Sequence, residues 1–290
     1  MDEKLRKLVF ELLLGTEKQY GFKIIFAGET GSRSYGLETE NSDVDIKGFF
    51  LYSEDKYLSV LKLTSYLKLN HETKLNKDID VDLELIDLRK YLRDRCKNVI
   101  LDESTLWLQT KSIYIDLIPK ELKELLQTSI QPPIFQIWSK ISKYQQKFIK
   151  SKQLDDGLVI VKDVLNSIVQ SYQVLYIKKK DSVQDMQLNF ENIYLQVKQI
   201  FQEDNNSQNY QELLEFIDKM YELGQVLYQL KMKDNKNRIH FEDQRLKDYF
   251  YYMQTFILNE QPVERNNFDH LKKSNYIFKL FVQELSKHFV

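Results

Sequence analysis

The sequence predicts an α/β domain with a small mixed sheet over residues 1–115, followed by an all-helical domain over residues 116–290. Strand-like patterns of apolar residues occur only in the first part. In the second part apolar residues recur at helical spacing in long stripes. Three of the eight glycines of the chain lie between Gly28 and Gly36. In a chain with so few glycines, such a cluster indicates a place where the backbone must approach another group closely.

The α/β part opens with a helix and a strand. Apolar residues at helical spacing predict a helix over residues 3–14, and Gly15 is placed to end it. Residues 23–27 form a short apolar run that predicts a buried strand, and residues 43–51 predict a second one. Residues 57–70 fit a strand and a helix equally well.

The clearest strand pattern lies between residues 78 and 86. Apolar and acidic residues alternate there, with Ile79, Val81, Leu83 and Leu85 on one face and Asp80, Asp82 and Glu84 on the other. This alternation predicts a strand with one buried face and one acidic face. Asp87 follows directly and is a candidate N-cap for a helix that begins at Leu88.

From about residue 115 onward no segment has the period of a strand. Helical stripes lie at residues 134–148, 158–175, 213–230, 249–258 and 276–289, the first of them opened by Pro132-Pro133. Together they predict a bundle of helices. Polar stretches at residues 203–209 and 231–238 are expected to be solvated loops between helices.

Composition limits the classes of partner and compartment. The formal net charge is −1, from 42 basic and 43 acidic residues, so no global positive field indicates a dedicated nucleic-acid binder. A single cysteine, Cys96, cannot form an internal disulfide, which fits a reducing compartment. No apolar run approaches the roughly 18 residues of a membrane span. We therefore expect a cytoplasmic protein without a membrane partner, with a nuclear location left open.

The acidic residues have the spacing of a metal site. Asp43 and Asp45 are two positions apart, which places both side chains on one face of a strand. A third carboxylate is expected from a neighbouring strand, where alternation alone leaves Asp80, Asp82 and Glu84 equal. Carboxylates converging from adjacent strands can hold the two Mg²⁺ or Mn²⁺ ions of a phosphoryl-transfer site.

A glycine-rich turn precedes these acids at a suitable distance. Gly31-Ser32 follows the first strand, where backbone N–H groups at a helix start and a hydroxyl can bind phosphate. Ten residues separate Ser32 from Asp43, which is enough for a short helix and a turn back to the sheet.

The runs at residues 31–37 and 41–48 resemble the DNA polymerase β nucleotidyltransferase superfamily. More narrowly, they are similar to predicted nucleotidyltransferases that include an RNA-ligase-associated branch. Those carry a Gly-Ser-Arg-x-x-Gly run, a Ser-Asp-x-Asp pair and then a basic residue, which here is Lys47. The resemblance is close over residues 24–50, good over 80–108 and faint in the helical part.

The resemblance also implies roles for single residues. The family has an Asp five positions before an acidic-Leu-Arg-Lys helix start, which here is Asp82 before Asp87. It implies that Asp43, Asp45 and Asp82 are catalytic metal ligands, and that a nucleoside triphosphate is the substrate. Phosphate contacts are implied for Gly31, Ser32, Arg33 and Lys162. The helical part is expected to bind the base and the acceptor.

The helical part departs from the family pattern, and several alternatives stay open. Asn166 and Val169 stand where the family tends to have a His and an Arg after the lysine. Arg33 fits a surface ion pair and a triphosphate contact equally well, whereas Lys47 is expected to pair with an acid of a neighbouring strand. The sequence predicts transfer of a nucleoside monophosphate to a hydroxyl of RNA. The alternatives are an enzyme that modifies a protein or small molecule, and a catalytically silent subunit of a complex.

Overall fold

The computed structural model describes residues 3–40, 42–75, 77–96, 104–128, 137–138, 141–146, 158–203, 210–234, 238–240, 243–258 and 269–285. The chain divides into two compact units. The first comprises Met1–Ser34, Glu40–Gln131 and Arg265–Val290, and the second comprises Tyr35–Thr39 and Pro132–Glu264. The sequence predicts one boundary, between residues 115 and 116, whereas each compact unit is built from several segments. A short piece of the glycine-rich region thus belongs to the second unit.

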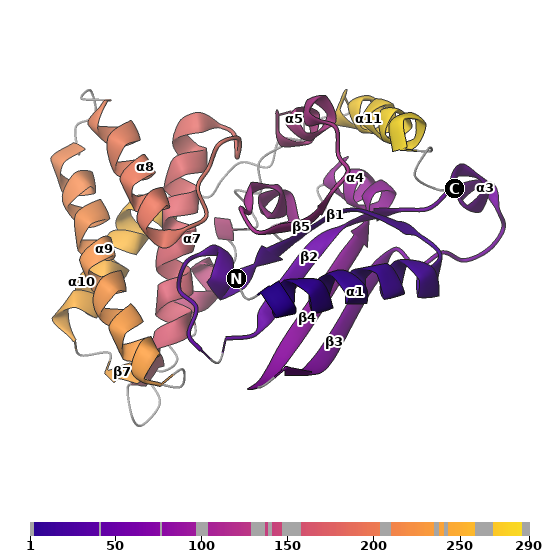
Figure 1. Cartoon of the computed structure of the whole chain (residues 1–290). Coiled ribbons are helices and arrows are strands. Elements are labelled where there is room, and N and C mark those ends of the chain that lie inside the picture. Colours follow the sequence, from indigo (N-terminus) through magenta and orange to yellow (C-terminus); the bar gives the residue numbers. More distant parts are fainter. Residues whose placement is uncertain are drawn as a thin grey trace. The chain divides into compact units, whose positions relative to one another are not determined.

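The first unit is a five-stranded mixed sheet with helices on both faces (Figure 1). The strand order is β3-β4-β2-β1-β5, in which β2 and β4 are parallel and the other neighbours are antiparallel. Its elements, in chain order, are α1 (Glu3–Tyr20), β1 (Lys23–Thr30), α2 (Gly31–Ser34), β2 (Val44–Leu51), α3 (Glu54–Leu58), β3 (Tyr66–Leu75), β4 (Lys77–Asp87), α4 (Leu88–Cys96), the 3₁₀-helix η1 (Ser104–Gln109), β5 (Ile113–Asp116), α5 (Lys120–Thr128) and α11 (Asp269–Leu285).

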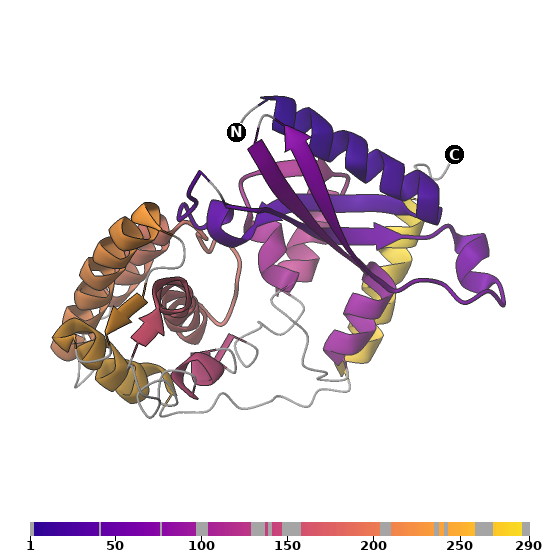
Figure 2. The same cartoon turned by 90° about the horizontal axis from the view of Figure 1, so that it is seen from below.

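Each face of this sheet carries its own apolar core. On one face α1 packs through Leu5, Val9 and Leu13 onto strand residues that include Val44 and Val81. On the other face α4, η1, α5 and α11 form a second cluster, and Figure 2 shows α1 and α11 on opposite sides of the sheet. Because side chains alternate along a strand, the residues between Val44 and Ile46 and between Val81 and Leu83 point away from α1.

The first helix, α1, ends later than the sequence predicts. The prediction that Gly15 ends the first helix was wrong, because α1 continues to Tyr20. Gly21 ends it instead, with a φ of 66° and an N–H that donates to the Glu17 carbonyl at 2.8 Å. A residue with a left-handed φ ends a helix, and Gly15 keeps helical backbone.

Other expectations for the first unit are confirmed. The two predicted strands are β1 and β2, and the alternating segment is β4. The Asp87 carboxylate accepts the Arg89 backbone N–H at 2.9 Å, as an N-cap should. The segment that fitted both helix and strand contains the end of α3 and the start of β3.

The second unit is helical, as predicted. It contains α7 (Val161–Lys180), α8 (Phe190–Gln202), α9 (Tyr210–Lys233), α10 (Gln244–Tyr252) and the π-helix η2 (Met253–Leu258). The expectation that this half has no strand was wrong, because β6 (Leu158–Ile160) and β7 (Arg238–His240) form a small antiparallel pair. Strands of three residues are too short for a period of two to be recognised.

Part of the predicted helix over residues 134–148 lies outside the described residues. In the part that is described, residues 137–138 and 141–146 are helical, and Ile137 and Ile141 are buried. In the described part of the chain, no helix has the length and apolar content needed to cross a membrane.

Candidate active site

Two of the predicted site residues are direct neighbours across the parallel strands β2 and β4. Asp45 is the register partner of Asp82. Neighbouring strands lie about 4.8 Å apart, and register partners point to the same side of the sheet. The flanking residues Val44, Ile46, Val81 and Leu83 are buried in the core beneath α1. Both carboxylates therefore lie on the face opposite α1.

Such a pair is unfavourable for the fold itself. Like charges on directly neighbouring positions of a sheet repel one another and destabilise the pairing. Carboxylate oxygens are the ligands that hard divalent cations prefer, so the donor types fit Mg²⁺ or Mn²⁺.

Gly31 brings the glycine-rich turn against this pair. Its φ is 66°, and a Cβ at this position would lie 2.1 Å from Oδ2 of Asp45. Only glycine satisfies both conditions, since a left-handed φ and a contact below 3 Å each disfavour a side chain. The first residue of α2 thus lies directly on the Asp45 carboxylate, and Ser34 closes this turn by donating from Oγ to the Gly31 carbonyl at 3.1 Å.

Asp43 and Asp80 extend the acidic end of the two strands. Asp43 is exposed and directly precedes β2, and Asp80 is exposed one position before Val81 of β4. Within the residues that the structure describes, no three His, Cys, Asp or Glu side chains gather closely enough to form a metal site. The structure therefore makes neighbours of Asp45 and Asp82 and does not gather Asp43 with them into one cluster.

Glu84, the third acid of the β4 face, is already engaged. Lys47 is its register partner, and Nζ of Lys47 lies 2.9 Å from Oε2 of Glu84. The hydroxyl of Tyr66 donates to Oε1 at 2.7 Å, and Lys47 also lies over the Trp107 ring, 5.4 Å from its centroid. The interpretation of Lys47 as the partner of a strand acid is confirmed. This pairing favours Asp82 and Asp80 over Glu84 as the third metal carboxylate.

Arg33 forms an ion pair with the strand that precedes it. Its Nε lies 3.9 Å from Oε1 of Glu29, whose side chain is only 5% exposed. Neither of these two atoms has a hydrogen-bond partner. The pair is therefore loose, and a better acceptor can compete for the guanidinium. No pattern in the sequence indicates Glu29, because it is the only acid of its strand and has no second acid at a regular spacing from it.

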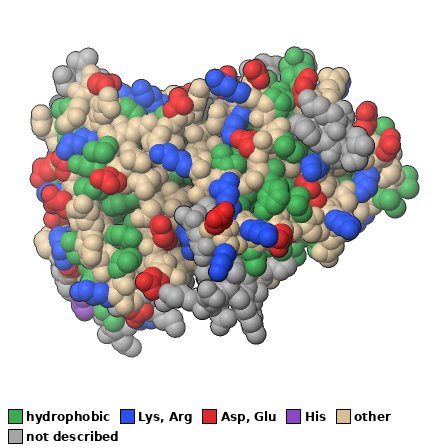
Figure 3. Space-filling view, viewed as in Figure 1, with side chains coloured by type: hydrophobic (Ala, Val, Ile, Leu, Met, Phe, Trp, Pro, Cys, Tyr) green, Lys and Arg blue, Asp and Glu red, His purple; other side chains and the backbone are tan. Residues whose placement is uncertain are grey.

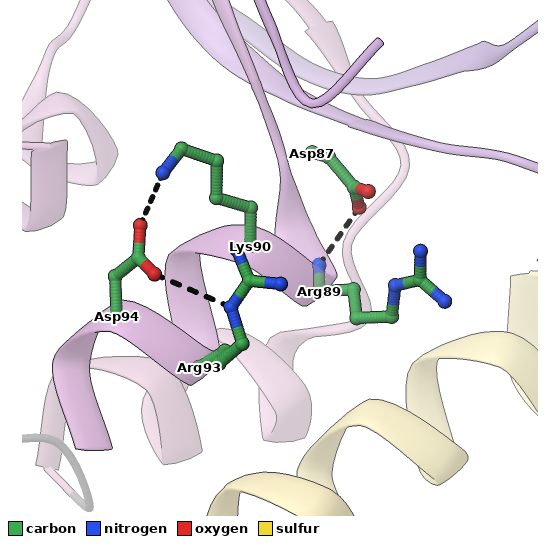
Figure 4. A network of polar contacts seen from close by, with 5 residues as sticks. All are labelled: Asp87, Arg89, Lys90, Arg93 and Asp94. Atoms are coloured by element: carbon green, nitrogen blue, oxygen red, sulfur yellow. Dashed lines mark hydrogen bonds and ion pairs between the residues drawn. The ribbon is translucent and has the colours of Figure 1, made fainter. Parts of the chain in front are cut away.

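A polar network holds the junction that follows Asp82 (Figure 4). Asp87 is 1% exposed and accepts hydrogen bonds from the Tyr57 hydroxyl at 2.7 Å and from the Arg89 backbone. Burial raises the pKa of Asp87, while the hydrogen bond from Tyr57 acts in the opposite direction. One turn further along α4, Asp94 pairs with Lys90 and Arg93. This network anchors the C-terminal end of β4 and so supports the strand that carries Asp82.

In the helical unit, Lys162 is exposed near the start of α7. Asn166, one turn on, is half-buried, and Val169 is completely buried in the core. The structure also places a second lysine, Lys231 of α9, close enough to Lys162 for the two charges to interact. Sequence reasoning assigned the stretch from residue 231 to a solvated loop, which was wrong, because Lys231 is 3% exposed and helical.

Comparisons with known proteins match parts of the chain to a family model and to a relative, and align it with a solved structure. Residues 5–108 match the sequence model of the family described as RNA repair pathway DNA polymerase beta family. An uncharacterized protein of Bacillus subtilis (strain 168), YcgL, is 30% identical over 56 residues, which are 19% of this chain and 22% of that protein. The matched segment thus spans about a fifth of the relative's length. A nucleotidyltransferase-like protein from Exiguobacterium sibiricum 255-15 aligns over 96% of this chain and 89% of its own, with 10% identity and a TM-score of 0.29.

Proposed function

We propose that residues 5–108 form a nucleotidyltransferase domain of the DNA polymerase β type, and that the chain transfers a nucleoside monophosphate from a nucleoside triphosphate to a hydroxyl of RNA. The observation that carries the proposal is the contact of the Asp45 carboxylate with Gly31, beside its register partner Asp82. The turn proposed to bind phosphate and the acid proposed to bind metal are neighbours, which supports the proposal because the reaction needs both functions close together.

In the proposed reaction, the acceptor hydroxyl oxygen forms a bond to the α-phosphorus of the triphosphate. The bond from that phosphorus to the bridging oxygen breaks, and pyrophosphate leaves. Asp43, Asp45 and Asp82 would hold the divalent ions, and Asp82 would help to take the proton from the attacking hydroxyl. When bound, Mg²⁺ or Mn²⁺ stabilises the charge on the attacking and leaving oxygens.

The triphosphate contacts are proposed for the glycine-rich turn. The backbone at Gly31 and the hydroxyl of Ser32 bind the β- and γ-phosphates. Arg33 exchanges its loose contact with Glu29 for a phosphate oxygen, since charge-assisted hydrogen bonds of a guanidinium to phosphate are strong. A phosphate contact from Lys162 of the helical unit stays a prediction of the sequence.

RNA is the acceptor that the observations favour. The description of the family that matches residues 5–108 names an RNA repair pathway. On the face in Figure 3, basic and acidic side chains are interspersed, which favours a local contact with RNA over a broad one.

A second candidate function is a catalytically silent subunit of a complex. The buried side chain of Val169 favours it, because the position where the family tends to have an arginine faces the helical core here. If Val169 occupies the position of the family's arginine, a substrate contact made from there is missing in this chain. Modification of a protein or small molecule is the remaining alternative from the sequence.

A transfer assay tests the proposal. It combines each α-labelled nucleoside triphosphate with Mg²⁺ or Mn²⁺ and a mixed RNA pool, beside an Asp43→Ala/Asp45→Ala double variant. Label on RNA with the wild type, and none with the double variant, would support RNA nucleotidyltransfer and identify the base. Label on protein would favour the protein-modifying alternative. Measurable triphosphate binding without any transfer would favour the silent subunit.

A further inference from the structure

A five-residue segment of the glycine-rich region, Tyr35–Thr39, is packed into the helical unit. Along the chain it lies between the phosphate-binding turn that ends at Ser34 and the acid at position 43. The segment has no regular secondary structure. Its conformation therefore depends on contacts that other elements supply.

Three backbone carbonyls of this segment accept hydrogen bonds from α8 and α9. The Tyr35 carbonyl accepts the Phe190 N–H at 2.8 Å, at the first residue of α8. The Leu37 carbonyl accepts Nζ of Lys231, and the Glu38 carbonyl accepts the Tyr228 hydroxyl at 3.1 Å. Three donors on two helices thus fix four consecutive residues of an otherwise irregular chain.

Close packing reinforces these hydrogen bonds. Gly36 has a φ of 65°, and a Cβ there would lie 2.2 Å from Nδ2 of Asn189, the N-cap residue of α8. The Leu37 side chain is buried. The segment therefore has one backbone path against the helices, and a side chain at position 36 would displace it.

Lys231 is the unusual member of this set. A lysine is rarely buried to 3% exposure, because removal of the ammonium group from water is costly. Burial, aided by the nearby charge of Lys162 and opposed by Glu38, lowers the pKa of Lys231 to about 8. Neighbours on α9 are Tyr228, which binds the same segment, and Lys233, which is exposed. The fold keeps this buried cation despite its cost, and the cation donates a hydrogen bond to a carbonyl of the segment. This indicates that the conformation of the segment is important to the protein.

We propose that Lys231 is a positioning residue that clamps the segment Tyr35–Thr39 to α9 and thereby fixes the chain between Gly31-Ser32 and Asp43. The kinetic part of this inference rests on the proposed function. The structural part concerns only contacts within the helical unit. Tyr228 is a second, weaker member of the clamp, because its donor is a neutral hydroxyl.

The first arm of the test is hydrogen–deuterium exchange of peptides that cover residues 35–40, and it needs no substrate. We expect exchange to be on the order of tenfold faster in Lys231→Met and a few-fold faster in Tyr228→Phe, since local opening controls exchange. Lys233→Met, two residues away on the same helix and exposed, serves as the matched control and should not change it. Unchanged exchange in both Lys231→Met and Tyr228→Phe would overturn the clamp.

The second arm measures kcat, KM and their pH dependence in the transfer assay, with Mn²⁺ affinity as a readout that needs no turnover. A misplaced turn should lower kcat/KM on the order of tenfold to 100-fold in Lys231→Met. The wild-type kcat/KM should decline partly above about pH 8, where Lys231 becomes a neutral and weaker donor to the Leu37 carbonyl although the fold as a whole gains stability. This inflection should be absent in Lys231→Met and displaced to higher pH in Lys231→Arg, which should also recover part of the rate.

The outcomes separate the clamp from the proposed function. Faster exchange with wild-type Mn²⁺ affinity, kcat/KM and pH profile in Lys231→Met would overturn the positioning role. If the wild type transfers no nucleotide, the proposed function fails. Faster exchange together with weaker Mn²⁺ binding in Lys231→Met would then still support the clamp.

Discussion

Each of the two units holds a pair of like charges, and the two pairs differ in their exposure to water and therefore in their free-energy cost. In the sheet, Asp45 and Asp82 are register partners, and both are partly exposed. In the helical unit, Lys162 is exposed but Lys231 is buried, and the pKa of Lys231 is lowered to about 8. Water screens the acidic pair, so its cost stays moderate. The buried lysine bears a larger cost, which its hydrogen bond to the Leu37 carbonyl offsets in part.

The difference indicates two kinds of constraint. The acidic pair is partly exposed, so a cation from solution can reach it. The buried lysine has its acceptor inside the protein, so it is suited to holding the chain. The predictions below test this contrast, from the largest expected effect to the smallest.

Replacement of Asp82 by Asn should give the largest effect. The amide keeps the size of the side chain but removes its charge and its capacity to accept a proton. Loss of such a group typically lowers the rate about 10²–10⁴-fold. We expect this loss in kcat, measured in the transfer assay at saturating triphosphate.

Asp80→Asn and Glu84→Gln are matched controls on the same face of β4. Glu84 is bound by Lys47 and Tyr66, and Asp80 is exposed, so both variants should keep most of the activity. A larger loss in Asp80→Asn than in Asp82→Asn would assign the third carboxylate to Asp80 instead.

Replacement of Lys231 by Met should change how stability depends on pH. The pKa of Lys231 falls from 10.5 to about 8 on folding, so between these values the unfolded chain binds more protons. The stability contribution of Lys231 therefore rises as pH increases from about 8 to 10.5. At about 1.4 kcal/mol per pKa unit, the full change is on the order of 3 kcal/mol.

Denaturant titrations at pH 7.5 and pH 10 measure this slope. Lys231→Met should have a flatter dependence than the wild type, whereas Lys233→Met should follow the wild type because Lys233 is exposed. Equal slopes in Lys231→Met and Lys233→Met would show that burial does not depress the pKa of Lys231.

The pattern of the sequence indicated Asp45 as a site residue but did not indicate Lys231, for a physical reason. Asp43 and Asp45 are two positions apart, and the period of a strand converts that spacing into a shared face. The partner Asp82 needed the register of two strands far apart in sequence, so alternation alone left it equal to Asp80 and Glu84. Lys231 donates to a carbonyl 194 positions away along the chain, and no local pattern encodes that contact.

The helix ends and short strands illustrate the same limit. Gly15 and Gly21 are both compatible with a helix end, and only the tertiary position of β1 decides where α1 must end. The three-residue strands β6 and β7 are specified by each other and not by their own sequence. Long amphipathic segments such as α9 were predicted well, because a stripe of seven apolar residues repeats the helical period several times.

Replacement of Gly31 by Ala tests whether the turn places the Asp45 carboxylate. The left-handed φ costs an alanine about 1–2 kcal/mol, and the added Cβ would lie 2.1 Å from Oδ2 of Asp45. We expect a loss of that size in the free energy of unfolding, together with weaker Mn²⁺ binding. Gly15→Ala is the control, since no atom lies within 4 Å of its Cβ position. It should stabilise α1 by roughly 0.5–1 kcal/mol.

The smallest effect is expected for a buried acid that two donors already bind. Asp87 is buried like Lys231 but faces no like charge, and it accepts from Tyr57 and from the Arg89 backbone. Tyr57→Phe removes one donor and should lower the free energy of unfolding by about 1–1.5 kcal/mol. It should also raise the pKa of Asp87 further, since the Tyr57 hydrogen bond holds it down. The loss should therefore shrink as pH falls through the pKa of Asp87, because the protonated acid no longer needs that donor.

Thermal unfolding of Tyr57→Phe at pH 7 and at pH 5 measures this change. Tyr66→Phe is the exposed counterpart, in which the lost hydroxyl donates to the partly exposed Glu84. It should cost about 0.5 kcal/mol or less, because water replaces the missing donor. If Tyr66→Phe lowers the free energy of unfolding as much as Tyr57→Phe does, burial does not determine how much an acid in this sheet loses with one of its donors. The contrast between the partly exposed acidic pair and the buried lysine would then need another cause.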